Sequence, residues 1–169
     1  MNNSTFIDFY CNNGENGDNL SFYDVLGLSN AEMESRHNWV QWAFPTKTIS
    51  AFNKDVPVLS RRTWQILRKN SEAKIRFYSI LNKTLKFLGM ATGHNYEIAQ
   101  IECKDWFFNR SDHNRLRITR IIESCVLFGR RDIALSLFRL FLNLSRDNPH
   151  NFTFDNLNHW YNAAYHTKL

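Results

Sequence analysis

Residues 112–129 contain the pattern that most restricts how this chain can fold. Apolar side chains recur there every three or four residues, which is the spacing of one face of an α-helix. A capping residue, Ser111 or Asp112, precedes the pattern, and Gly129 follows it where a helix is expected to end. The apolar face consists of Ile118, Ile121, Ile122, Cys125 and Phe128. A helix with this face must be covered by other elements, so the pattern predicts a packed helical core.

Similar patterns extend over most of the remaining chain. Ser29 and Glu32 form a capping-box pattern ahead of a helix predicted over residues 31–44, which Pro45 ends. The helix predicted over residues 71–88 carries one apolar stripe, formed by Ile75, Tyr78, Leu81, Leu85 and Leu88. A short turn of helix is predicted at residues 21–28. Further helices are predicted after a Ser60 cap, more weakly over residues 96–106, from an Asp132 cap to about residue 145, and after a Thr153 cap.

No strand pattern competes with these helices, and 6 glycines and 3 prolines are too few for a fold made of many turns. The sequence therefore predicts an all-α fold, a compact single-domain bundle of about five to seven helices. We expect residues 1–29, with a polar loop at residues 11–19, to form an N-terminal segment packed on a helical domain of residues 30–169.

Charge and cysteine content restrict the environment and the partners of the chain. The formal net charge is +5, but residues 1–60 carry −4 and residues 61–169 carry +9. A basic body suits an anionic partner, although the two halves could also complement each other. Cys11, Cys103 and Cys125 form no close pair, which is typical of free thiols in a reducing compartment. Without a signal peptide or an apolar run of about 18 residues, a cytoplasmic location is expected, or a nuclear one in a eukaryote.

Motifs for common catalytic chemistry are absent from the sequence. It has no phosphate-binding glycine loop, no nucleophile elbow and no Cys/His metal spacing. We therefore predict no catalytic residues, no cofactor and no metal, and we expect a binding protein rather than an enzyme. An enzyme that uses His37 or His113 as an acid or base stays open as an alternative, because histidine titrates near neutral pH.

Two polar constellations are candidates for a binding site. The first lies on the predicted 31–44 helix, where two polar side chains stand four residues apart beside a tryptophan. The second follows one side of the helix after residue 112, and its arginines suit carboxylate or phosphate. The same groups could instead form a hydrogen-bonded network that locks two helices together. The candidate residues are His37, Gln41, Trp42, His113, Asn114, Arg117 and Arg120.

A third set of residues supports a different partner. Basic side chains are frequent over residues 61–131, and such a surface can bind nucleic acid or another polyanion. The tryptophans follow helix periodicity rather than alternating with Lys and Arg, which favours a role in the core over base stacking. The candidate polyanion-binding residues are Arg61, Arg62, Arg68, Lys69, Lys74, Arg130 and Arg131.

Three stretches resemble the conserved domain of the opioid growth factor receptor family. They are NAEMESRHNWVQWAFP at residues 30–45, VPVLS at residues 56–60 and DHNRLRITRIIESCVLFGRRDIAL at residues 112–135. Val40, Ala43 and Phe128 depart from the family pattern, and each departure is conservative for packing. The residues that match family motif positions are His37, Gln41, Trp42, Phe44, Pro45, His113, Asn114, Arg117, Arg120 and Gly129.

The resemblance implies a function in binding. Animal members of the family are described as receptors for an enkephalin pentapeptide and are associated with the nucleus. This chain is similar to the stand-alone domain of microbial members, since the animal receptors continue beyond it. We expect a peptide or protein partner to bind a cleft lined by His37 and Gln41 on one side and by His113, Arg117 and Arg120 on the other. Trp42 is expected to form an apolar wall, and the oligomeric state stays open.

Overall fold

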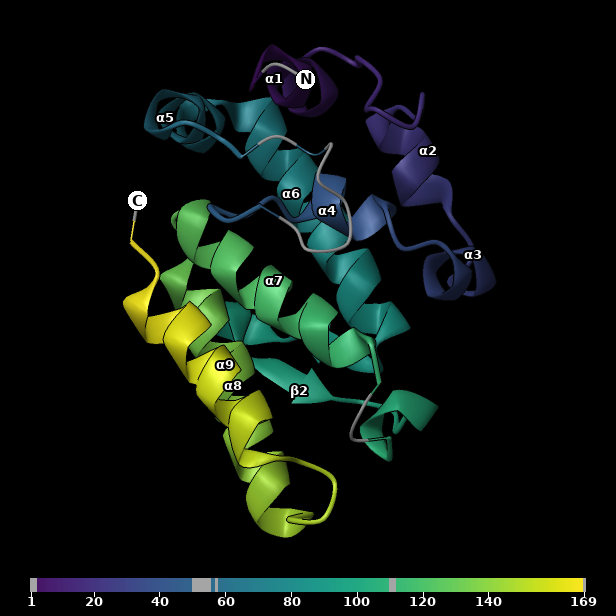
Figure 1. Cartoon of the computed structure of the whole chain (residues 1–169), viewed down its shortest axis with the longest axis vertical. Helices are drawn as coiled ribbons and strands as arrows, with labels where there is room; N and C mark the ends of the chain where they lie inside the picture. The colour runs from purple at the N-terminus through teal and green to yellow at the C-terminus, as the bar shows by residue number, and fades with distance from the viewer. Residues whose placement is uncertain (1–2, 50–55, 57, 110–111, 169) are drawn as a thin grey trace. The chain divides into compact units, whose positions relative to one another are not determined.

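The computed structural model describes residues 3–49, 56, 58–109 and 112–168, and most of these residues are helical (Figure 1). This confirms the predicted all-α class. The chain forms two compact units, residues 1–83 and residues 84–168, and the boundary between them falls within helix α6. The predicted segment boundary at residue 29 stays a prediction. Among the described helices, none has the length together with the apolar composition that crossing a membrane requires.

The first unit consists of short helices followed by the start of a long one. Ser60 caps α5 through its hydroxyl, which accepts from the Thr63 amide, and Ser29 forms a capping box with Glu32. Both caps were predicted from the sequence. The helices are α1 Asn3–Cys11, α2 Phe22–Gly27, α3 Asn30–Ser35, α4 Trp39–Ala43, α5 Arg61–Lys69 and α6 Ser71–Phe87.

The single helix predicted over residues 31–44 is wrong, because the structure divides it into α3 and α4. Arg36 takes an extended conformation, with φ −89° and ψ 133°, and so ends α3. The Trp39 indole N–H then donates to the Met33 carbonyl oxygen at 2.9 Å, which stabilises the break. Helix periodicity could not reveal it, since apolar residues keep a similar spacing on both sides.

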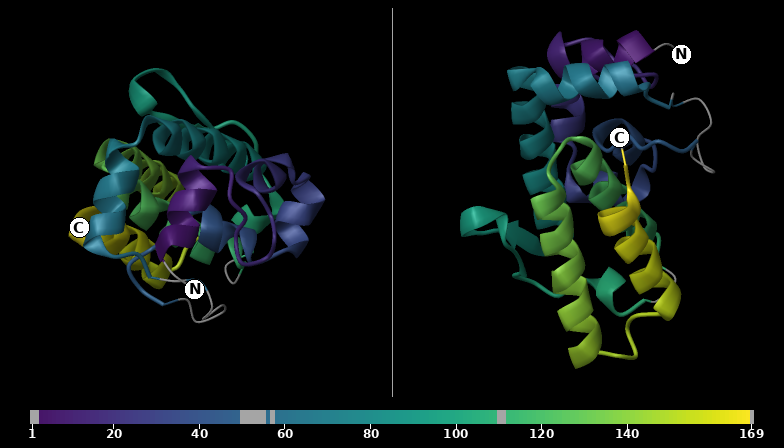
Figure 2. Two further views of the ribbon diagram at one scale, coloured as in Figure 1. Left: turned by 90° about the horizontal axis from the view of Figure 1, so that it is seen from above. Right: turned by 90° about the vertical axis from the view of Figure 1, so that its left-hand side faces the viewer.

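Aromatic rings form the centre of the first unit. The Phe6 ring stacks on the Trp42 indole with ring centroids 4.6 Å apart, and Phe9 packs against both Phe22 and Trp42. The Tyr10 hydroxyl donates to the Ala43 carbonyl oxygen, which ties α1 to α4. Such ring pairs contribute about 0.5–1.5 kcal/mol each beyond the burial of their area. Helix α1 also lies beside α5 (Figure 2).

A buried arginine sets the orientation of α6. Arg76 donates to Glu72 at 2.7 Å, to the Phe9 carbonyl oxygen at 2.9 Å and to the Asn13 side chain. The side of α6 that carries Arg76 faces the core. Ile75 lies on a different side of the helix and is 59% exposed. Ile75 was therefore placed wrongly in the buried stripe, whereas Leu81, Leu85 and Leu88 are buried as predicted.

The second unit is built on three helices that pack against one another (Figures 1 and 2). Thr153 caps α9 in a capping box with Asn156, as its predicted role requires. Asp132 is not a cap, because α8 begins one residue before it, and Ser111 lies outside the described residues. The elements are β1 Met90–Thr92, η1 His94–Tyr96, β2 Ile98–Gln100, η2 Asp105–Phe107, α7 Asn114–Leu127, α8 Arg131–Asp147 and α9 Phe154–His166.

The weak helix predicted over residues 96–106 is also wrong, since a β-hairpin occupies much of this region. β1 pairs antiparallel with β2, and Ala91 lies opposite Ala99. The turn between them contains Asn95 and Tyr96 at positive φ. The Ile98 amide donates to the Ser136 hydroxyl of α8 at 2.9 Å. The hairpin is therefore fixed by a contact with a distant helix, which local sequence does not show.

Glycines end two of the long helices, and the one at Gly129 was predicted from the sequence. Gly129 has φ +83°, and the following amide, that of Arg130, donates to the Cys125 carbonyl oxygen at 2.8 Å in a Schellman arrangement. Gly89 has φ +81°, and a Cβ there would lie 2.3 Å from the Glu102 carbonyl oxygen. Only glycine fits at position 89 without movement of the backbone.

A second buried arginine organises the second unit. Arg115 donates to the carbonyl oxygens of Asn109 at 3.0 Å, Phe107 at 3.1 Å and Asn151 at 2.8 Å. Its own carbonyl oxygen accepts from the Trp160 indole at 3.2 Å. Arg115 thus joins α7 to α9, and it also joins α7 to the segment before α7 and to the segment before α9.

Candidate functional site

The first predicted constellation is divided between a surface position and the core. His37 is exposed and lies in the break between α3 and α4, whereas Gln41 and Trp42 are buried within α4. Trp42 stacks on Phe6, so its indole belongs to the aromatic core of the first unit. His37 is therefore the residue of this set that solvent reaches directly.

The second constellation contains a buried polar pair. Arg117 donates to the Asn114 side-chain oxygen at 2.9 Å, and both residues are buried on α7. The Arg117 guanidinium also lies 5.9 Å from the centre of the Phe87 ring, a cation–π contact. This pair fits the locking network that the sequence left open as an alternative.

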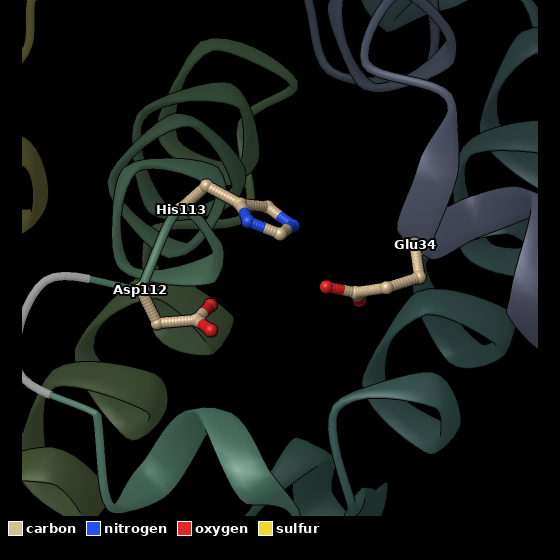
Figure 3. A group of neighbouring side chains, drawn as sticks. All are labelled: Glu34, Asp112 and His113. Carbon is tan, nitrogen blue, oxygen red and sulfur yellow. The ribbon is translucent and has the colours of Figure 1, made fainter.

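His113 and Arg120 are the half-buried members of the second set. Burial lowers the pKa of the Arg120 guanidinium below its ordinary value, and the charge of Glu123 opposes this shift. Figure 3 shows the side chains of His113 and Asp112 at the start of α7. The Asp112 carboxylate accepts from the Asn114 amide at 2.8 Å, but the N-cap of α7 is His113, so the predicted Asp112 cap is wrong by one residue. Glu34, also drawn there, is an exposed residue of α3.

The two constellations belong to different units of the chain. His37, Gln41 and Trp42 lie in the first unit, whereas the residues from His113 to Arg120 lie in the second. The cleft predicted to join them therefore stays a prediction. The alternative of an enzyme with a paired His37 and His113 stays a hypothesis for the same reason.

The basic residues predicted to bind a polyanion have different surroundings in the structure. Arg130 pairs with Asp132 at 2.6 Å and lies over the Tyr96 ring, 3.8 Å from its centre. Arg131 donates to the carbonyl oxygens of Ala164, Tyr165 and Thr167 and so caps the end of α9. These two arginines hold the second unit together, and the remaining members lie on α5 and α6.

Two surface features were missed by the sequence reasoning. An open depression of about 320 Å³ in the first unit is lined in part by Asp24 and Glu32. Both carboxylates already accept from capping serines, and the bonds from Ser21 lower the pKa of Asp24. The second feature is an aromatic cluster where α8 meets α9, made of Phe138, Tyr161 and Tyr165. The spacing of the two tyrosines, four residues apart, was the signal available in the sequence.

Comparison with known proteins identifies the family. The family described as "Opioid growth factor receptor (OGFr) conserved region" matches residues 1–168. This chain belongs to the opioid growth factor receptor family. Opioid growth factor receptor-like protein 1 of Xenopus tropicalis is 30% identical over 118 residues, which cover 68% of this chain and 23% of that protein. The human opioid growth factor receptor is 27% identical over 125 residues, which cover 71% and 17% respectively.

The chain spans less than a quarter of the length of these two curated relatives. No solved structure matches it. Within this member of the opioid growth factor receptor family, the motif residues have distinct places. Trp42, Phe44 and Pro45 are buried, Gly129 ends α7, and His37 is exposed. The apolar part of the motifs therefore makes the fold, and a smaller polar part reaches the surface.

Proposed function

We propose that this chain is a non-enzymatic binding module that engages a peptide or protein partner. Its relatives are named as receptors or receptor-like proteins, which supports a binding role. The observation that carries the proposal is the α9 aromatic cluster, Phe138, Tyr161 and Tyr165. Exposed aromatic surface is enriched at protein interfaces and dominates their binding energy.

The geometry of the cluster suits a partner. The Tyr161 and Tyr165 rings stack 4.7 Å apart and are 41% and 43% exposed. Phe138 packs edge-on against both rings at 5.7 and 5.8 Å, which fixes their orientation. The rings are thus pre-ordered, so binding loses little side-chain entropy. Phe154, which is 81% exposed, lies seven residues before Tyr161 and thus on the same side of α9.

The polar residues predicted from the sequence have a second part in this proposal. His113 and Arg120 are half-buried at the surface of α7, and His37 is exposed in the first unit. We assign contacts with the partner to these three residues. Gln41, Trp42, Asn114 and Arg117 support them from inside each unit, since all four are buried.

Affinity capture with variants tests this function. The chain, immobilised on beads, is exposed to a lysate of its source cells, and recovered proteins are quantified by mass spectrometry. We expect Tyr161→Ser/Tyr165→Ser to reduce recovery of the main partner about tenfold or more, since aromatic anchors contribute about 2 kcal/mol or more each. His113→Ala/Arg120→Ala should reduce it by a smaller factor.

Phe108→Ser is the matched control, because Phe108 is an exposed aromatic residue of the same unit and lies outside the cluster. It should recover the partner as the wild type does. Equal recovery by the wild type and the tyrosine variant would remove the cluster from the interface. A wild-type chain that recovers nothing beyond the beads alone would end the proposal.

We also propose a cytoplasmic location, with the nucleus as the alternative in a eukaryotic cell. The three cysteines are all free thiols, which suits a reducing compartment. A fluorescent fusion that accumulates outside the cell would contradict this location.

A further inference from the structure

One helix surface in the first unit carries positive charges that the stability of the fold does not require. Successive residues of an α-helix are rotated by about 100°. On α5 the buried residues Thr63, Trp64 and Leu67 therefore occupy one side. The other side carries the exposed residues, which we call the α5 face: Arg61, Arg62, Gln65, Ile66 and Lys69.

Among the described residues, no acidic side chain pairs with the cations of the α5 face. Residues 61–74 contain five Lys or Arg and a single acidic residue, Glu72. Glu72 is engaged by the buried Arg76 at 2.7 Å. Arg61, Arg62, Lys69 and Lys74 form no ion pair within the part of the chain that the structure describes. Arg68 is half-buried, and its burial lowers the pKa of its guanidinium.

Helix stability does not account for the two arginines at the start of α5. Arg61 and Arg62 lie in the first turn, where the helix dipole is positive and disfavours cations. Lys69, in the last turn, is in contrast favourable for the helix. Residues that break a local rule without a structural gain are expected at functional surfaces.

An apolar side chain in the middle of this face indicates the kind of partner. Ile66 is 37% exposed and lies one turn from both Arg62 and Lys69 on the same side of the helix. Nucleic acid presents phosphates and sugars to such a surface, and an exposed isoleucine contributes little there. A protein segment can satisfy both features, with carboxylates opposite the cations and an apolar side chain against Ile66.

We infer that the α5 face is a docking surface for an acidic, amphipathic segment of a partner protein. The inference rests on the proposed function in that the partner is a protein. It adds the chemistry of the contact: bidentate arginine–carboxylate pairs around a small apolar contact. Association of this kind is accelerated by charge and weakens with salt.

The test uses defined probes and the whole chain. A labelled peptide of about 20 residues, long enough to form a helix, carries glutamate on one face and leucine on the other. Its lysine/leucine counterpart and a DNA duplex of about 20 base pairs are the alternatives. Fluorescence anisotropy measures the dissociation constant of each probe at about 50 mM and about 200 mM salt.

The wild type should bind the glutamate peptide at least about tenfold more tightly than the lysine peptide and the duplex. Arg61→Glu/Arg62→Glu should weaken this binding about tenfold or more and leave the melting temperature equal or higher, since acidic residues suit the first turn. Ile66→Ser should weaken binding several-fold without changing its salt dependence. Lys86→Glu/Arg139→Glu is the matched control, because it makes the same change in net charge at exposed positions of the second unit.

Three results would overturn the inference. One is equal loss of affinity in the control variant, which would show a general charge effect. The second is tighter binding of the duplex than of the glutamate peptide. The third is no peptide binding at low salt. If the affinity capture recovers a protein partner while any of these results is found, the inference fails and the proposed function stands.

Discussion

At the residue scale, two buried arginines do most to define the polar interior. Arg76 and Arg115 are 4% and 3% exposed, and backbone carbonyl oxygens are prominent among their acceptors. Burying a charge costs much free energy unless hydrogen bonds compensate it, and these carbonyl oxygens supply such bonds. Each arginine lies among the buried apolar residues of its helix. Arg115, for example, stands three residues before a buried isoleucine. An arginine at an apolar position of a helix was the signal in the sequence that it has a structural role.

We predict that Arg115→Met lowers the free energy of unfolding by about 3 kcal/mol. The methionine fills part of the space but leaves the carbonyl oxygens of Phe107 and Asn151 without their donor. Urea unfolding followed by circular dichroism measures the change. Arg139→Met, at an exposed position of the same unit, should stay within about 0.5 kcal/mol of the wild type. Equal effects of the two changes would contradict the assigned role.

The cysteines should differ sharply in reactivity. Burial raises the pKa of the Cys125 thiol, with a further contribution from Asp132, and removes it from solvent. Cys103 is exposed. A thiol reagent followed by peptide mass spectrometry should label Cys103 in the folded chain, and Cys125 only in denaturant. Labelling of Cys125 at the rate of Cys103 would show that this core is open.

The contribution of the Arg130–Asp132 ion pair to stability should be lost at acidic pH. Hydrogen bonds from Arg130 hold the pKa of Asp132 below its ordinary value. A group with a lowered folded-state pKa stabilises the fold above its unfolded pKa, about 4, and loses this contribution as the pH falls. Asp132→Asn should therefore lose less stability than the wild type between about pH 5 and pH 2. Unfolding curves across this range measure it, and identical acid profiles would contradict the pair.

At the element scale, signals carried by a few neighbouring residues were read correctly. The caps at Ser29, Ser60 and Thr153 and the glycine end of α7 depend on local hydrogen bonds, so the sequence reveals them. The break between α3 and α4 depends on a bond from Trp39, and the hairpin depends on Ser136 of a distant helix. Such long-range contacts have no local pattern.

The candidate site was predicted less completely than the helices. The motifs contain His37, His113 and Arg120 at or near the surface, but Trp42 and Arg117 look equally polar or amphipathic in sequence and are buried. Residue type alone could not separate contact residues from supporting ones. The α9 aromatic cluster was missed because Phe138 lies on another helix and completes it only in the fold.

The turn after α6 offers a prediction about backbone geometry. Gly89→Ala should destabilise the chain by about 2 kcal/mol, because its φ of +81° and its approach to the Glu102 carbonyl oxygen both exclude a Cβ. Gly27→Ala is the control, since a Cβ there meets nothing within 4 Å. Thermal unfolding of the two variants measures the difference. A neutral Gly89→Ala would show that the loop moves freely.

At the scale of the whole molecule, the surface features differ in chemistry and so in their response to salt. The contact that we propose for the α9 aromatic cluster is apolar, and salt does not weaken such a contact. The contact that we infer for the α5 face is ionic, and salt screens such a contact. A partner that uses both should lose part of its affinity as salt increases and keep the remainder. The two proposals together describe a chain whose helical units present separate contact surfaces.

The most direct test of the central claim is calorimetric titration of the purified chain with the partner that affinity capture recovers. We predict saturable binding that Tyr161→Ser/Tyr165→Ser weakens about tenfold or more and Phe108→Ser leaves unchanged. Equal affinities for the wild type and the tyrosine variant, or no heat of binding with any recovered protein, would contradict it.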